Sequence, residues 1–332
     1  MQKRIALIVC YYGKFPEWID IWLKSCEFNK EYDFFLVTDN NSLKEVPQNV
    51  KVIYQTMNDL KVKLSKAAGF EVVLRTPYKL CDYKPLYGKA LEEYLVEYDF
   101  WGHCDLDLIW GRLSNFLTDD IFDKYDLIGM YGHLMIYRNT DYMNSIFKLD
   151  GGVFGYKEVF LHADNFSFDE MSGIDLIAQR NRISHYKRLK IANMSPNYKR
   201  FKISSMKSEK EYFIWEKGKV LRIYGIKGNL VEEFAYIHFS GKKPTVQLSQ
   251  ESIKNANIYL SSKNITERKT CELNELELME HNEYVSNKED KKTLKKFKKN
   301  KIKEIIHKSI PQKIIWLKVH KGIWKFNCYN KH

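Results

Sequence analysis

Two carboxylates with one residue between them close an apolar run in the first third of the chain. Residues 100–107 read Phe-Trp-Gly-His-Cys-Asp-Leu-Asp, so Asp105 and Asp107 directly follow the apolar residues. Carboxylates at i and i+2 where a strand ends can turn toward one hard divalent cation, which prefers oxygen ligands and also binds phosphates. Acid-x-acid triplets are common, and a solvated turn capped by Asp105 is the alternative.

A histidine late in the chain stands next to residues that suit a phosphate. His238 is followed by Gly241, Lys242 and Lys243. A neutral imidazole can bind a divalent cation. Glycine lets the backbone approach phosphate oxygens, and lysine supplies positive charge. The pattern predicts His238 as a metal ligand and the two lysines as diphosphate contacts, with a purely structural histidine as the alternative.

The hydrophobic pattern predicts the elements that must position these residues. Four apolar runs have the length of strands, at residues 5–10, 34–38, 50–54 and 100–104. Helical spacing or a helix-initiating proline marks three segments between them, at residues 18–23, 57–68 and 85–96. Strands that alternate with helices predict an α/β fold with an open, mostly parallel nucleotide-binding sheet flanked by helices.

Ligands of such sheets bind beyond the carboxyl ends of the strands. Polar clusters follow three of the predicted strands, namely Tyr11, Tyr12 and Gly13, then Thr38, Asp39 and Asn40, and finally Asp105 and Asp107. Because parallel strands end at the same edge of a sheet, we expect these three clusters to meet.

The pattern becomes mixed after residue 125. We expect a strand at residues 126–130, a helix at 175–182, a hairpin at 212–224 around Gly218, and a short strand at 236–239 that carries His238. After about residue 250 the hydrophobic pattern that indicates a packed globular fold becomes weaker.

Composition bounds the class of protein. The chain has 332 residues, of which 44% are hydrophobic and 14% aromatic, enough for a large α/β domain with a sizeable core. Its net charge of +12 suits nucleic acid, an anionic membrane or anionic small molecules. We expect residues 1–10 to form a first strand and not a signal peptide, and no window has the roughly 20 apolar residues of a membrane span. The six cysteines lack metal-ligand spacing, which favours free thiols in a reducing cytoplasm.

Together these features resemble a nucleotide-sugar glycosyltransferase of the GT-A fold. The resemblance rests on Tyr-Tyr-Gly after the first strand, on Leu-Val-Thr-Asp-Asn at residues 36–40, on the Asp-Leu-Asp triplet, and on His-Phe-Ser-Gly-Lys-Lys-Pro at residues 238–244. It implies that Tyr11 or Tyr12, together with Asp39, holds the base and ribose of the donor.

The likeness extends in part to the family 8 retaining transferases. There a His-x-x-Gly-x-x-Lys-Pro-Trp pattern supplies a third metal ligand and a lysine for the diphosphate. In this chain Pro244 follows Lys243 directly, the lysine is one position early, and no tryptophan follows. The resemblance implies Mn²⁺ or Mg²⁺ that bridges Asp105, Asp107 and the diphosphate, with His238 as a further ligand.

The resemblance also implies contacts to the sugars. Asp82 and Lys84 precede the helix that Pro85 opens, where Lys84 could meet a phosphate and Asp82 a sugar hydroxyl, or Asp82 could only cap the helix. Asp169 and Glu170 stand where many such transferases carry an acidic pair. One of them would be the general base in an inverting enzyme and would orient the sugars in a retaining one, and a helix cap is again the alternative.

The C-terminal segment is strongly basic. Residues 288–308 contain ten lysines and three acids, with apolar residues interleaved at near-helical spacing. This composition is typical of a helix on an anionic membrane. Nucleic-acid binding and a solvated tail on a partner are the alternatives, but no nucleic-acid-binding module is recognisable elsewhere. We expect a glycosyltransferase domain at residues 1–250, a linker or small helical segment at 251–287 and a membrane-associating tail at 288–332.

The sequence thus predicts a cytoplasmic glycosyltransferase, peripheral at the inner face of the cell membrane. It would move a sugar from a nucleotide-diphosphate donor, by resemblance a UDP-sugar, to a saccharide or lipid-linked acceptor in cell-surface polysaccharide synthesis, with His133 and Arg138 on the acceptor side. One alternative is a sugar nucleotidyltransferase, which would carry a glycine-rich basic loop where this chain has Tyr-Tyr-Gly-Lys-Phe. Another is a non-enzymatic basic adaptor for membranes or nucleic acid, which would not need acids at strand ends.

Overall fold

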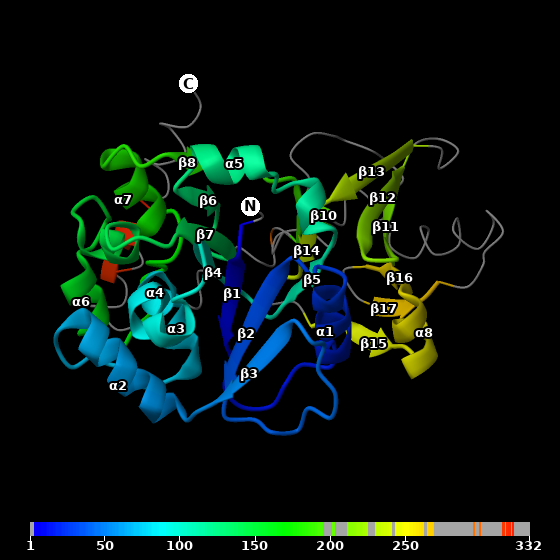
Figure 1. The fold of residues 1–332 in the computed structure, drawn as a ribbon, viewed down its shortest axis with the longest axis horizontal. Helices are drawn as coiled ribbons and strands as arrows, with labels where there is room; N and C mark the ends of the chain where they lie inside the picture. The colour runs from blue at the N-terminus through cyan, green and yellow to red at the C-terminus, as the bar shows by residue number, and fades with distance from the viewer. Residues whose placement is uncertain are drawn as a thin grey trace.

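A mostly parallel sheet forms the centre of the N-terminal half (Figure 1). The computed structural model describes residues 3–194, 201–202, 211–224, 230–240, 243–261 and 264–268, and isolated positions between 295 and 321. The first sheet has the order β3-β2-β1-β4-β7-β6-β8, and β7 runs antiparallel to both of its neighbours. Its strands are β1 (Ile5–Cys10), β2 (Tyr32–Thr38), β3 (Val50–Tyr54), β4 (Phe100–Cys104), β6 (Leu127–Gly129), β7 (Leu134–Arg138) and β8 (His185–Tyr186).

Helices cover both faces of this sheet, because successive side chains of a strand point to opposite faces. Ile8 of β1 packs in the core beneath α2, α3 and α4, whereas Leu7 packs in the core beneath α1 and α5. The helices are α1 (Ile19–Glu27), α2 (Met57–Ala68), α3 (Leu80–Tyr83), α4 (Tyr87–Ala90), α5 (Asp119–Lys124), α6 (Tyr156–Phe160), α7 (Ile174–Arg180) and α8 (Gln250–Asn255). The described part of the chain is therefore a mixed α/β protein, as the alternating pattern predicts.

Local sequence signals fix the ends of α2. Thr56 and Asp59 form a reciprocal capping box at its N-terminus, which satisfies backbone N–H groups that lack a partner within the helix. Gly69 ends the helix with a φ of 85°, a left-handed conformation in which glycine avoids the strain of a Cβ atom. The predicted helix at residues 57–68 is confirmed at both ends.

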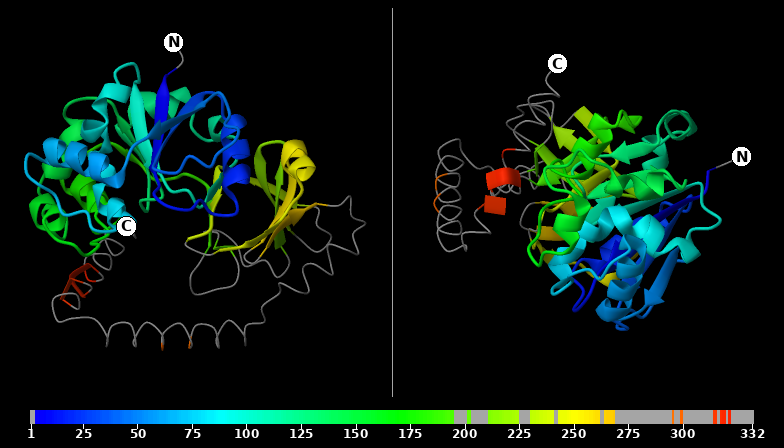
Figure 2. Two further views of the ribbon diagram at one scale, coloured as in Figure 1. Left: turned by 90° about the horizontal axis from the view of Figure 1, so that it is seen from below. Right: turned by 90° about the vertical axis from the view of Figure 1, so that its left-hand side faces the viewer.

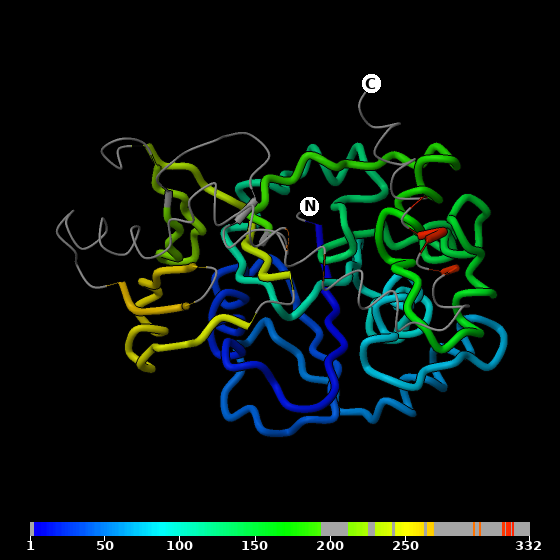
Figure 3. Tube along the Cα trace, turned by 180° about the vertical axis from the view of Figure 1, so that it is seen from behind, coloured from blue at the N-terminus to red at the C-terminus, as the bar shows by residue number. Residues whose placement is uncertain are grey.

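Two smaller sheets follow the first. The second has the order β10-β9-β14-β5, and the third has the order β13-β12-β11-β16-β17-β15. Figure 2 and Figure 3 show the third sheet beside α1, on the side of the molecule away from α6 and α7. The second-sheet strands are β5 (Leu108–Trp110), β9 (Ile191–Met194), β10 (Phe201–Lys202) and β14 (Tyr236–His238). The third-sheet strands are β11 (Glu211–Glu216), β12 (Lys219–Tyr224), β13 (Leu230–Phe234), β15 (Thr245–Gln247), β16 (Asn257–Leu260) and β17 (Asn264–Glu267).

The third sheet extends past the expected domain end at residue 250. Helix α8 and strands β16 and β17 lie within residues 250–268, which the composition assigns to a linker or small helical segment. Trp215 of β11 and Ile21 of α1 lie in one apolar cluster, so this sheet rests on a helix of the first layer. The predicted hairpin around Gly218 is confirmed as β11 and β12.

One expectation about a helix is wrong. The segment 85–96 does not form one helix, because the buried Leu91 and Leu95 adopt φ angles of −122° and −110°, outside the helical region. Packing of these leucines outweighs the helical preference of the sequence. The short 3₁₀ segments are η1 (Pro77–Lys79), η2 (Lys84–Leu86), η3 (Glu92–Tyr94), η4 (Leu113–Asn115) and η5 (Met143–Lys148).

The basic tail at 288–332 lies outside the described residues except for isolated positions, so its association with an anionic membrane stays a prediction from composition. Within the described part of the chain, every helix is too short or too polar to cross a bilayer.

The centre of β4 provides a test of the packing of the first sheet. A Cβ atom at Gly102 would lie 2.6 Å from the Met135 carbonyl oxygen, which cannot move without disturbing β7, and 2.9 Å from the Leu7 side chain. We expect Gly102→Ala to lower the free energy of unfolding by about 2–3 kcal/mol in denaturant titrations. Gly155→Ala is the matched control, because no atom lies within 4 Å of its added Cβ. Equal stabilities of the two variants would contradict this packing.

Candidate metal centre

The Asp-Leu-Asp triplet forms a short, anchored loop between β4 and β5. Leu106 points into the core and is 5% exposed, which leaves the acids on either side of it at the surface of the loop. The indole Nε1 of Trp18 donates a buried hydrogen bond of 3.0 Å to the Leu106 carbonyl. The Phe239 amide donates one of 3.0 Å to the Asp107 carbonyl. Hydrogen bonds from two other elements therefore hold the backbone that carries Asp105 and Asp107.

Strand pairing brings His238 to this loop. Strand β14 pairs antiparallel with β5, and His238 lies opposite Leu108, the residue after Asp107. The His238 Nε2 atom lies 3.3 Å from Asp107 Oδ1 and 3.9 Å from Asp105 Oδ2. These separations suit two ligands of one divalent ion, whose bonds are roughly 2.0–2.4 Å long.

A neighbouring strand orients the His238 ring. Its Nδ1 atom lies 2.8 Å from the Asn193 side-chain oxygen on β9. An amide oxygen only accepts hydrogen bonds, so Nδ1 carries the proton and a neutral ring keeps the Nε2 lone pair toward the acids. A partner of this kind commonly fixes the ring of a metal-binding histidine. One ligand atom each from Asp105, Asp107 and His238 lies within 4.8 Å of the others, so these three residues could hold a metal ion.

Lys84 joins the metal group to a second carboxylate. Its Nζ atom lies 2.5 Å from Asp105 Oδ1, 2.8 Å from Asp169 Oδ2 and 3.0 Å from the Gly132 carbonyl oxygen. Burial alone would lower the pKa of Lys84, but the charges of Asp105 and Asp169 outweigh it and hold this pKa well above its usual value. The ammonium has three protons and three acceptors, so the predicted phosphate contact through Lys84 would require one of these bonds to break.

Asp169 and Glu170 lie on a turn before α7 that Asp82 holds in place. The fully buried Asp82 carboxylate accepts hydrogen bonds from the amides of Phe166 and Phe168 and pairs with Lys79 at 2.7 Å. Asp82 therefore fixes the backbone of the turn that carries Asp169 and Glu170. Nothing among the described residues brings it to a position where it could meet a sugar hydroxyl.

The two acids titrate as a pair. Burial raises the pKa of Asp169 to about 7, against the opposing effect of Lys84. Burial and then the charge on Asp169 raise the pKa of Glu170 to about 8. The Asp169 Oδ1 atom is buried and has no hydrogen-bond partner among the described residues. Glu170 is partly exposed, and a carboxyl with a pKa near neutrality suits proton transfer.

A glycine lets the β6–β7 loop pass close to the acidic pair. Gly132 has a φ of 78°, and a Cβ atom there would lie 2.8 Å from Asp169 Oδ2 and 2.9 Å from Glu170 Cγ. Its neighbour Tyr131 also has a positive φ, of 70°. Positive φ costs a residue with a side chain roughly 1 kcal/mol or more, so the loop is held in a demanding conformation beside the site.

The expected nucleotide-binding residues divide into two groups. Burial and then the charge of Asp107 raise the pKa of Tyr11, which places this side chain beside the acid pair. Asp39 is exposed at the same edge and accepts a hydrogen bond of 3.0 Å from the Gly13 amide. Tyr12 instead lies in the core, 8% exposed.

Other expected site residues lie elsewhere. His133 is buried beneath the metal group with its ring against His238, at a centroid distance of 4.4 Å, so it does not line an acceptor surface. Arg138 lies opposite Phe100 at the other end of β4 and pairs with Asp126 at 2.6 Å. The structure therefore does not support either residue on the acceptor side.

Of the two lysines predicted to contact the diphosphate, the structure describes one. Lys242 lies outside the described residues, and Lys243 is exposed. Asn193 and the bridging contacts of Lys84 were missed by the sequence pattern. An asparagine within a strand carries no signal of its own, and the contacts of Lys84 join segments that are distant in the chain.

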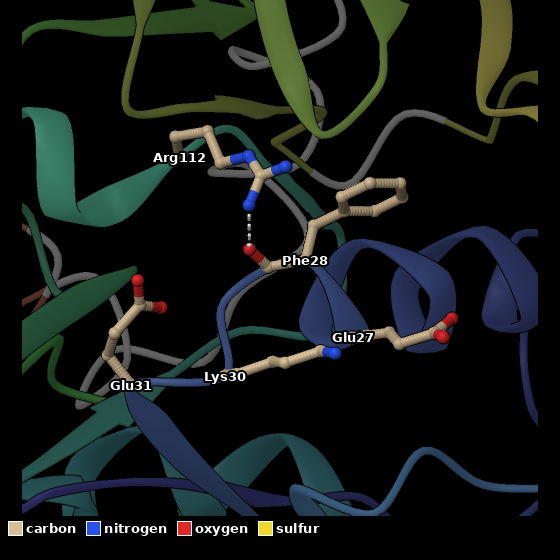
Figure 4. A pocket seen from close by; sticks show the side chains of 5 residues that line it. All are labelled: Glu27, Phe28, Lys30, Glu31 and Arg112. Atoms are coloured by element: carbon tan, nitrogen blue, oxygen red, sulfur yellow. Dashed lines mark hydrogen bonds between the residues drawn. The ribbon is translucent and has the colours of Figure 1, made fainter.

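A surface pocket of about 340 Å³ lies apart from this centre (Figure 4). It is lined by Glu27, Phe28, Lys30, Glu31 and Arg112. Arg112 donates a hydrogen bond of 2.8 Å to the Phe28 carbonyl. Because four of the lining residues directly precede β2, the pocket faces the amino edge of the sheet, whereas the acids follow the carboxyl edge.

One family model matches the chain, over residues 7–270, and it describes a family of unknown function (DUF6625). The matched span includes the three metal-centre residues, Lys84 and the acidic pair. No curated protein matches the chain.

The metal centre can be tested by binding. We expect isothermal calorimetry to show one site for Mn²⁺, lost in Asp107→Ala and weakened about tenfold or more in Asn193→Ala, which removes the partner that orients His238. Asp120→Ala, which changes an exposed acid on α5, is the control and should bind as the wild type does. Unchanged affinity in Asp107→Ala would exclude this centre.

The buried acid pair should make stability depend on pH. The pKa of Glu170 is raised from 4.5 to about 8, so the folded state retains a proton that the unfolded chain has lost. The stability of the wild type should therefore fall as pH rises from about 4.5 to 8. At pH 8, with metal removed, Glu170→Gln should unfold with a free energy about 2 kcal/mol higher than the wild type, and the difference should vanish near pH 4.5.

The exposed Glu158 on α6 supplies the control for this measurement. Glu158→Gln should follow the wild-type curve of unfolding free energy against pH. A Glu170→Gln curve that also follows the wild type would show that burial does not raise the pKa of Glu170 in the folded state.

Proposed function

The chain belongs to DUF6625, a family of unknown function, and we propose that it is a metal-dependent glycosyltransferase that uses a nucleotide-diphosphate sugar. The observation that carries this proposal is the meeting of Asp105, Asp107 and His238 beyond the carboxyl end of β4, in a mostly parallel sheet. Ligands of such sheets bind at this edge. An acid-x-acid loop joined there by a late histidine also resembles the metal sites of GT-A transferases.

The charges of the site suit a departing nucleoside diphosphate. When bound, Mn²⁺ or Mg²⁺ would neutralise negative charge on the diphosphate, which can lower the barrier by several kcal/mol. Asp105, Asp107 and His238 would hold the ion, and the exposed Lys243 stands five residues after His238. Tyr11 and Asp39 lie at the same edge and would contact the base and ribose of the donor, for which the resemblance favours UDP.

Asp169 and Glu170 would act at the sugars, in positioning and in proton transfer. Lys84 holds one oxygen of the buried Asp169 at 2.8 Å, which would fix the turn that presents the adjacent Glu170 to a sugar. Glu170 is more exposed than Asp169, and its pKa near 8 suits a group that takes the proton of an acceptor hydroxyl.

The acceptor in this proposal is a saccharide or a lipid-linked glycan of cell-surface polysaccharide synthesis. The basic composition of residues 288–308 supports a place at the inner face of the membrane, since each lysine near an anionic surface contributes about 1 kcal/mol to binding.

A donor screen tests the proposal. We expect the wild type to release nucleoside diphosphate from one of a set of UDP-, GDP- and TDP-sugars with Mn²⁺ present, and to stop when EDTA is added. Asp107→Ala should lower turnover at least 100-fold, which corresponds to about 2.7 kcal/mol of barrier. The exposed Asp120→Ala should leave it unchanged. Turnover without metal would contradict the mechanism, and release of pyrophosphate from a nucleoside triphosphate and a sugar phosphate would identify a nucleotidyltransferase instead.

A further inference from the structure

A large aromatic side chain lies exposed near the acidic pair. Tyr78 of η1 is 71% exposed, although most tyrosines of the fold are at least partly buried. Local interactions fix the turn that carries it. Pro77 begins η1, and the Leu80 amide donates hydrogen bonds to the Pro77 and Tyr78 carbonyls at its end. Because this ring contributes little to the core, it is free to contact a ligand from solvent.

Buried contacts join this turn to the segment that carries the acids. Lys79, the residue after Tyr78, is 1% exposed and donates hydrogen bonds to the carbonyls of Val159 and Asp164. Lys79 also pairs with Asp82, which accepts from the Phe168 amide directly before Asp169. Tyr78 and Asp169–Glu170 therefore lie on two segments that one buried ion pair holds together.

The electrostatics of Tyr78 agree with this placement. Burial around its hydroxyl, then the charges of Cys81, Glu170 and Asp169, raise the pKa of Tyr78 to about 12. Tyr78 thus lies near enough to Glu170 and Asp169 for their charges to act on it, while most of its side chain is open to solvent. A ligand on this ring would thus extend toward Glu170.

We propose that Tyr78 is the stacking platform of the acceptor subsite, on which a saccharide ring lies with a hydroxyl directed at Glu170. The face of an aromatic ring is negative and attracts the positively polarised C–H groups of a sugar. A carboxylate accepts hydrogen bonds from sugar hydroxyls. The subsite would therefore take a neutral saccharide that offers one apolar C–H face and at least one free hydroxyl.

The layout of the site places this platform opposite the donor edge. Asp105 joins Lys84, Lys84 joins Asp169, and Glu170 follows, so the contacts lead from the metal group outward to the acidic pair and Tyr78. Tyr11 and Asp39 lie on the loops after β1 and β2, at the other side of Asp107. His133 is buried and Arg138 lies at the opposite edge, whereas Tyr78 is exposed near the acidic pair.

The inference rests on the proposed transfer reaction, and its test keeps the two apart. The probes are lactose, maltose and cellobiose, with the donor found in the screen. Three experiments are made: steady-state kinetics for acceptor KM and kcat, slow donor hydrolysis without acceptor, and saccharide binding by saturation-transfer NMR. Tyr78→Ala should raise acceptor KM about tenfold and weaken the NMR signal, while donor hydrolysis and Mn²⁺ affinity stay at wild-type values.

Two variants separate the ring face from other effects. Tyr78→Phe keeps the face and should stay within about threefold of the wild-type KM. Tyr142→Ala removes a tyrosine that is 57% exposed and follows Arg138 at the opposite edge, so it should change nothing. None of these substitutions should move the thermal unfolding midpoint, since both tyrosines are exposed.

The inference is overturned if Tyr78→Ala leaves acceptor KM unchanged, or if the wild type hydrolyses donor but neither binds nor glycosylates any of the three saccharides. If the wild type shows no metal-dependent donor hydrolysis, the proposed transfer reaction itself fails. These two results differ in whether hydrolysis is present in the wild type.

Discussion

The site depends on one buried ammonium group with three acceptors. Lys84 Nζ binds Asp105, Asp169 and the Gly132 carbonyl, and these three acceptors come from the β4–β5 loop, the turn before α7 and the β6–β7 loop. Carboxylates that lose water must be paired or protonated, because isolated charge is costly in a protein interior. Lys84 thus permits two acids to remain close together, and it sets the relative positions of the three segments that carry the site.

Lys84 does not neutralise the whole cluster. Asp107 adds a further carboxylate nearby, whereas burial raises the pKa of Asp169 to about 7 and that of Glu170 to about 8, so Glu170 holds its proton near neutral pH. This remaining negative charge attracts a cation at the position where Asp105, Asp107 and His238 meet. The same electrostatic imbalance therefore accounts for a metal group on one side of Lys84 and proton-binding carboxyls on the other.

The sequence allowed the edge of the sheet to be predicted, but not the contacts around it. Apolar runs located the strands, and hence Asp105 and Asp107, because a strand buried on both faces leaves a continuous pattern. His238 was found from the lysines and glycine near it. The bridge through Lys84 could not be found, since it joins segments far apart in the chain and has no local pattern. The helix expected at 85–96 failed for a similar reason, because the packing of Leu91 and Leu95 is a tertiary effect.

The pairing of β14 with β5 has a consequence for folding. Asp107 and His238 belong to segments that are distant in the chain and meet only when this pairing forms. In an unfolded chain, closing so long a loop costs conformational entropy, so the three ligands are dispersed and bind an ion weakly. An ion that prefers the assembled ligand set stabilises the native state by mass action. The second sheet, which contributes His238 and its partner Asn193, would then be the last part of the centre to form and the first to lose its order when metal is withdrawn.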